Sequence, residues 1–150
     1  MTNSSSKLFF RISAVLWLIW GAVHILAGVL TVVQATPEAV MGIADAANPD
    51  ILTAVYPEAA GAIINQHGFN LFWVGLVTFI GGFYIWRQNR TAVLGTALVG
   101  GLTDVGYFIF MDIGGFVNFA PGTVMTIICL TAIILSFLAT FSAKKTQENK

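Results

Sequence analysis

Four long runs of apolar residues divide the chain, and shorter polar segments separate them. The runs span about residues 8–33, 69–86, 91–111 and 123–141. Each run approaches or exceeds the roughly 20 residues that a helix needs to cross about 30 Å of hydrocarbon. The runs are continuous and lack the alternation typical of lipid-facing strands in a barrel. The pattern therefore predicts an all-α integral membrane protein, with four transmembrane helices forming one bundle over residues 1–150.

The longest polar connection, residues 34–68, follows the first run and contains three signals for the start of a helix. Residues 36–38 (Thr-Pro-Glu) combine a capping hydroxyl, a proline and an acid in the first turn. Residues 48–50 (Asn-Pro-Asp) end one helix and cap another, and residues 56–58 (Tyr-Pro-Glu) repeat the proline–acid start. We expect two or three short helices on the outer face of the membrane, the last of them with room to continue into the second crossing.

The basic residues lie in three clusters beside the apolar runs. Two of the connections between the runs contain no Lys or Arg. The clusters consist of Lys7, Arg11, Arg87, Arg90, Lys144, Lys145 and Lys150. The connections at 34–68 and 112–122 carry acids instead, namely Glu38, Asp45, Asp50, Glu58 and Asp112. Cytoplasmic segments of membrane proteins are enriched in Lys and Arg. The charges thus predict a multi-pass protein with both its N- and C-termini in the cytoplasm, in the inner membrane if the source is a bacterium.

Composition supports a membrane protein and excludes several other classes. The chain is 57% hydrophobic and 9% charged, whereas a soluble domain averages about 25% charged residues. No basic patch is interleaved with aromatic residues, which excludes nucleic acid as a partner. The single cysteine, Cys129, forms no internal disulfide, and the spacing of Cys and His indicates no metal site. Membrane lipids are the expected partners, and a homo-oligomer or a larger membrane complex remains open.

Two polar residues lie at similar depths inside the apolar runs. Asp104 is a carboxylate within the third run, where insertion costs at least ~2.5–3.5 kcal/mol and where such residues commonly mark a functional site. His24 lies in the first run. Counting about 1.5 Å per residue from the outer ends of the two runs places both side chains roughly 12–14 Å below the outer surface. If the first and third helices are neighbours, His24 and Asp104 meet, and the aspartate fixes the orientation of the imidazole ring.

Other polar and aromatic residues extend this pair into a candidate pocket. Trp20 and Tyr107 lie within one helical turn of the pair and would supply flat walls. His67 and Asn70, at the start of the second run, would line a polar outer mouth. The candidate site for ligand binding or proton relay is therefore His24, Asp104, Trp20, Tyr107, His67 and Asn70.

Three functions fit this pattern. The favoured one is a polar pocket within the membrane that binds a small or lipid-like ligand or relays protons. The second is an accessory subunit of a membrane complex, in which His24 and Asp104 only fasten two helices together. The third is a membrane-embedded acid–base enzyme, isomerase-like, acting on a hydrophobic substrate. The chain contains no nucleophile elbow, no HExxH motif and no glycine-rich phosphate loop to favour the enzyme.

Overall fold

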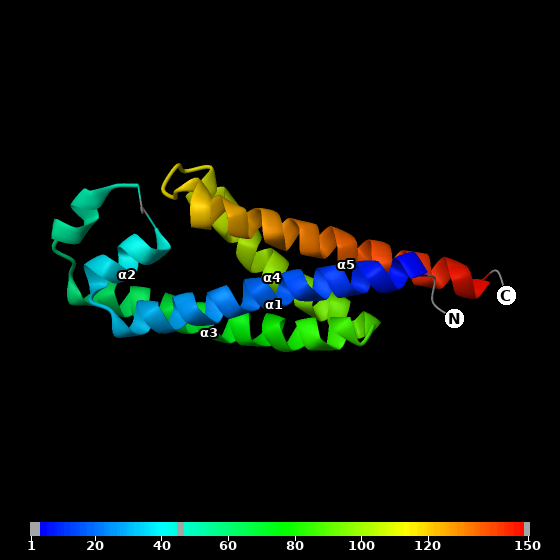
Figure 1. Ribbon diagram of the computed structural model, residues 1–150. Helices are drawn as coiled ribbons and strands as arrows, with labels where there is room; N and C mark the ends of the chain where they lie inside the picture. Colours follow the sequence, from blue (N-terminus) through cyan, green and yellow to red (C-terminus); the bar gives the residue numbers. More distant parts are fainter. Residues whose placement is uncertain (1–3, 45–46, 149–150) are drawn as a thin grey trace.

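The structure, a computed structural model, describes residues 4–44 and 47–148, with side chains as far as residue 143. Every regular element in this part of the chain is helical, and four helices are long and apolar enough to cross a membrane. These four helices alternate in direction and form one elongated bundle, with both termini at the same end (Figure 1). The predicted all-helical class with four long apolar helices is confirmed.

The helix bounds follow the apolar runs with one correction. The elements are α1 (Ser4–Val33), α2 (Thr36–Ile43), the 3-10 turn η1 (Pro49–Thr53), α3 (Glu58–Trp86), α4 (Arg90–Tyr107), the π turns η2 (Phe108–Asp112) and η3 (Phe119–Thr123), and α5 (Val124–Glu148). The prediction placed the second crossing from residue 69, and it read residues 56–58 as the start of a short helix with room to continue into that crossing. In the structure α3 begins at Glu58, directly after Pro57, and continues through Gly68 without a break. The connection between the first two long helices is therefore shorter than the predicted 34–68.

Each long helix packs on two neighbours, in the order α1, α3, α4, α5 and back to α1. The connection between α3 and α4 is tight: Gln88 has a positive φ of 64°, and the Asn89 side chain accepts a hydrogen bond from the Ala92 N–H. This turn makes α3 and α4 an antiparallel hairpin. Because α1 packs on α3 and α5, α1 and α4 lie diagonally across the bundle. The first and third of the long helices are therefore not neighbours.

The closest helix contact joins α1 to α3 through glycines. Gly21 and Gly28 lie two turns apart on α1, and Gly68 and Gly75 lie two turns apart on α3. A Cβ atom added to Gly21 would lie 2.8 Å from the Gly75 carbonyl oxygen, and one added to Gly75 would lie 2.6 Å from the backbone nitrogen of Ile25. The two backbones therefore touch, as small residues at a helix interface permit.

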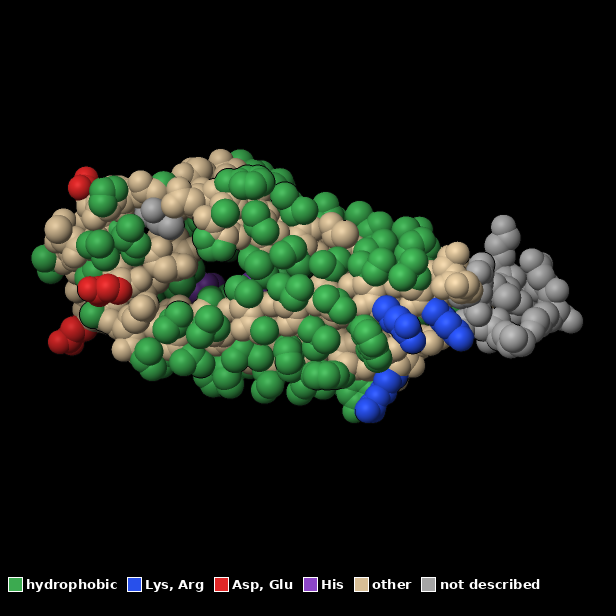
Figure 2. Space-filling view, viewed as in Figure 1, with side chains coloured by type: hydrophobic (Ala, Val, Ile, Leu, Met, Phe, Trp, Pro, Cys, Tyr) green, Lys and Arg blue, Asp and Glu red, His purple; other side chains and the backbone are tan. Residues whose placement is uncertain are grey.

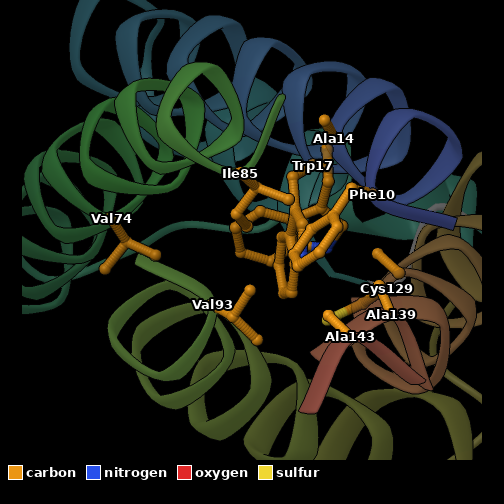
Figure 3. Close-up of a cluster of buried hydrophobic side chains, with 11 residues drawn as sticks. Phe10, Ala14, Trp17, Val74, Ile85, Val93, Cys129, Ala139 and Ala143 are labelled. Carbon is orange, nitrogen blue, oxygen red and sulfur yellow. The ribbon is translucent and has the colours of Figure 1, made fainter. Parts of the chain in front are cut away.

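Large buried side chains occupy only one half of the bundle. Figure 3 shows Phe10, Ala14 and Trp17 of α1 clustered with residues of the other long helices, including Val93 and Cys129. Beyond Gly21, the only buried residues of α1 are Gly28 and Thr31. The bundle is thus closed where these side chains pack. Towards the other end, Figure 2 shows a hollow between the lower pair of helices, α1 and α3, and the upper pair, α4 and α5, in which a histidine is visible.

Charge is segregated between the two ends of the bundle. Figure 2 shows Lys and Arg side chains at the closed end and Asp and Glu side chains at the end bearing α2. We call them the basic end, with Lys7, Arg11, Arg87 and Arg90, and the acidic end, with Glu38, Asp50, Glu58 and Asp112. Between the two ends, the sides of the bundle expose large apolar residues. The three-dimensional arrangement therefore keeps the charge pattern seen along the sequence.

Candidate polar site between α1, α4 and α5

Two tryptophans of α1 lie in the interior of the bundle and donate hydrogen bonds to α5 and α4. Trp17 Nε1 donates to Ser136 Oγ on α5 at 3.2 Å, and Trp20 Nε1 donates to Asp104 Oδ1 on α4 at 3.2 Å. Both indoles are fully buried and meet edge to face, with ring centroids 6.1 Å apart. Gly100 makes room for them, because a Cβ atom there would lie 2.5 Å from Cζ3 of Trp17. The Trp20 indole thus joins α1 to α4, two helices that are not neighbours.

Asp104 is the acceptor at the centre of this arrangement. Its side chain is 6% exposed. The Trp20 indole from α1 donates a hydrogen bond to it, and the Cys129 thiol from α5 lies beside it. A buried carboxylate is tolerated where such donors compensate its lost hydration. Asp104 therefore connects three helices in one polar junction.

His24 lies against Trp20, one helical turn further along α1. Its imidazole stacks on the Trp20 indole with ring centroids 3.5 Å apart and planes inclined by 19°. Its Nδ1 lies 2.8 Å from the backbone carbonyl oxygen of Trp20. A carbonyl oxygen can only accept, so Nδ1 carries the proton and donates. In the neutral imidazole, Nε2 is then an acceptor with a lone pair.

The Nε2 atom of His24 remains open to its surroundings. It has no hydrogen-bond partner in the described part of the chain, where every enclosed side-chain nitrogen or oxygen has one. Since His24 is only half buried, this nitrogen lies at an accessible surface. The stack on Trp20 and the Nδ1 hydrogen bond hold the ring while leaving Nε2 available to accept a hydrogen bond or a proton from a ligand.

The prediction expected His24 to meet Asp104 if the first and third long helices were neighbours. In the structure the two side chains are not joined directly. Trp20 contacts both residues and lies between them: its ring stacks on His24 and its N–H binds Asp104. The reason is the diagonal placement of α1 and α4, which only a side chain as long as tryptophan can bridge. We call His24, Trp20, Asp104 and Cys129 the polar cluster.

The remaining predicted site residues lie outside the polar cluster. Tyr107, half buried and one turn beyond Asp104, faces η3: a Cβ atom on Gly122 would lie 3.0 Å from its hydroxyl oxygen. His67 is exposed on α3. Asn70 Oδ1 accepts a hydrogen bond of 3.1 Å from Trp73 Nε1, which lies one turn further along the same helix.

The polar contacts of Asp112 and of Cys129 were missed by sequence reasoning. Asp112 accepts hydrogen bonds from Thr123 Oγ1 at 2.6 Å and from Thr126 Oγ1 at 2.8 Å, which fasten the acidic ends of α4 and α5 together. Cys129 lies beside Asp104. Cys129 and Ser136 are separated by two helical turns and so share one face of α5. That spacing was a signal for their common orientation towards the tryptophans of α1.

The described residues contain no group of three or more His, Cys, Asp or Glu side chains that could hold a metal ion. No protein-family model matches the chain, and no curated protein or solved structure matches it either. Inference about function therefore depends on the geometry of the polar cluster.

Proposed function

We propose that this chain is an integral membrane protein whose polar cluster binds a small or lipid-like ligand entering from the acidic end. The membrane placement is supported by four long helices with apolar exposed sides, and the orientation by the separation of basic and acidic ends. The basic end, with both termini, then faces the cytoplasm, which in a bacterium means the inner membrane. The segment with α2 and η1 lies on the outer face.

Labelling of single cysteines tests this orientation. Val55 is 96% exposed between η1 and α3 at the acidic end, and Thr91 is exposed in the first turn of α4 at the basic end. In intact cells or spheroplasts, a membrane-impermeant maleimide should label Val55→Cys, and it should label Thr91→Cys only after permeabilisation. The wild-type chain is the blank, because its one cysteine is buried. The reverse pattern would overturn the orientation, and equal labelling of both variants in intact cells would overturn the membrane placement.

The observation that carries the ligand proposal is the oriented, accessible Nε2 of His24. The Nδ1 hydrogen bond to Trp20 fixes the tautomer and the stack fixes the ring, so the acceptor is held in place before a ligand arrives. Pre-organisation of this kind reduces the entropy lost on binding. The matching ligand is an amphiphile with a hydroxyl or N–H donor, and the apolar sides of the hollow take up its hydrophobic part.

The same nitrogen would serve as a proton acceptor in a relay or in acid–base catalysis. An accessory subunit would need no accessible acceptor at this position. The oriented imidazole therefore favours ligand or proton chemistry over a purely structural role for the polar cluster.

Replacing His24 with phenylalanine tests the ligand proposal. Phenylalanine keeps a ring that stacks on Trp20 but removes both nitrogens, so the fold should be retained. Native mass spectrometry of the purified protein should show a bound small molecule in the wild type and at least about tenfold less in His24→Phe, the effect of losing about 1.4 kcal/mol of binding free energy. His67→Phe, which alters an exposed histidine outside the polar cluster, is the matched control and should retain the ligand.

Two results would contradict the proposal. Equal retention in His24→Phe and the wild type would show that His24 does not hold the ligand. A wild-type mass without any adduct, accompanied by co-purifying protein chains, would favour the accessory-subunit function instead.

A further inference from the structure

A groove lies between α1 and the α2–η1 segment, separate from the polar cluster. Its volume is about 470 Å³, within the range of roughly 300–1,000 Å³ that is usual for ligand pockets. Its walls are Val23, Leu26, Ala27, Leu30, Thr31, Gln34, Glu38, Met41, Gly42 and Leu52. No residue of the polar cluster belongs to this set.

The groove is apolar along its length and polar at one end. Its floor is formed by aliphatic side chains in the last three turns of α1, such as Leu26 and Leu30. Thr31 adds little polarity, since its hydroxyl donates within α1 to the Ala27 carbonyl oxygen at 2.8 Å. Gln34 and Glu38 follow the end of α1, where the chain turns into α2. The groove thus offers a hydrocarbon path that ends beside an amide and a carboxylate.

Charge at this end of the groove is negative. Glu38, exposed in the first turn of α2, is the one ionisable residue among the described residues of the lining. The whole sequence has no Lys or Arg between Arg11 and Arg87. An ammonium group placed beside Glu38 would therefore be attracted, and a sulfate or phosphate of the same size would be repelled.

We propose that this groove binds a membrane amphiphile with a cationic amine head group, its chain lying along α1 and its ammonium group beside Glu38. The site follows from charge complementarity at the end of an apolar groove. It is independent of the ligand that we assign to the polar cluster.

Photocrosslinking in nanodiscs tests the proposal with two probes of equal chain length. One is a dodecyl trimethylammonium and the other a dodecyl sulfate, each carrying a diazirine on its chain. Mapping by peptide mass spectrometry should find the cationic probe on residues 23–42 at least about ten times more often than the anionic one. Equal yields would show simple partition of alkyl chains and would overturn the proposal.

Three variants sharpen the test. Glu38→Gln should reduce the cationic crosslink about tenfold, whereas Glu58→Gln, an exposed acid at the same end outside the groove, should leave it unchanged. Gly42→Leu should reduce both probes, because a side chain there projects towards Gln34, whose Oε1 would lie 4.0 Å from its Cβ. An unchanged crosslink in Glu38→Gln would overturn the role of the carboxylate.

The variant His24→Phe separates this groove from the proposed ligand site. The crosslink on residues 23–42 should persist in His24→Phe, even though the ligand of the polar cluster is lost. Loss of both would show that groove and polar cluster form a single site and would overturn their independence. Unfolding temperatures of all variants, measured in the same nanodiscs, check that each one is folded.

Discussion

Replacing Gly28 with leucine is expected to prevent assembly of the bundle. A Cβ atom at this position runs into the backbone nitrogen of Phe72 and lies 2.6 Å from the Gly68 carbonyl oxygen. Overpacking against side chains usually costs about 1–3 kcal/mol. Here the obstacle is a helix backbone that cannot rotate away, so α1 and α3 must separate along their whole contact. Size-exclusion chromatography and thermal unfolding in mild detergent should show aggregation, or an unfolding temperature far below that of the wild type.

Gly95 provides the matched control for this substitution. It also lies within a long helix, but no atom outside its own helix backbone lies within 4 Å of a Cβ atom added there. Gly95→Leu should be neutral or slightly stabilising, because glycine is about 1 kcal/mol less favourable than alanine inside a helix. If Gly28→Leu were to unfold at the wild-type temperature, the close approach of α1 and α3 would be refuted.

The choice of helix partners could not be predicted from the small residues themselves. Glycines at intervals of seven residues occur both on α1 and on α3, and α4 carries Gly100. In the structure Gly21 and Gly28 meet the backbone of α3, whereas Gly100 of α4 accommodates the Trp17 ring. Spacing along a helix indicates that something approaches closely. It does not indicate whether that object is a backbone or a large side chain.

Hydropathy located the long helices but not the first turns of α3. Residues 58–68 are too polar to be read as part of an apolar run, and only the Tyr-Pro-Glu signal at 56–58 indicated a helix start there, with room to continue into the second crossing. In the structure, residues 58–68 are helical and contact the end of α1 and the start of α2. Gly61 packs on Thr36, and Gly68 packs on Thr31. Packing of this kind depends on the fold and leaves no periodic signal in a single sequence.

Residue counting gave the relative depth of His24 and Asp104 but not how they are connected. Distance along a helix follows from the rise per residue, whereas the direction of a side chain depends on how neighbouring helices are rotated. Trp20 was predicted as a wall of the pocket and turns out to be the link between the two residues. The part played by Cys129 depended on the rotation of α5, which one sequence does not reveal.

Replacing Asp104 with leucine is expected to destabilise the bundle much more than replacing it with asparagine. Leucine leaves the buried N–H of Trp20 without an acceptor, and an orphaned buried donor costs about 1–3 kcal/mol. Asparagine has nearly the same shape and keeps an oxygen that can accept from the indole. Unfolding in detergent, followed by tryptophan fluorescence, should place Asp104→Asn near the wild type and Asp104→Leu well below it.

A double-mutant cycle with Trp20→Phe shows whether this hydrogen bond is the cause. Phenylalanine has no N–H to leave unpaired, so the difference between Asp104→Leu and Asp104→Asn should shrink in that background, by a coupling energy of about 0.5–3 kcal/mol. An unchanged difference would mean that Asp104 stabilises the bundle through other contacts.

The asparagine variant also separates charge from hydrogen bonding in the proposed site. If the ligand retained by the wild type is lost from a stably folded Asp104→Asn, the negative charge acts on binding through the polar cluster. If Asp104→Asn keeps the ligand and only Asp104→Leu loses it, Asp104 acts by positioning Trp20, and through the stacked ring it holds His24 in the orientation that presents Nε2.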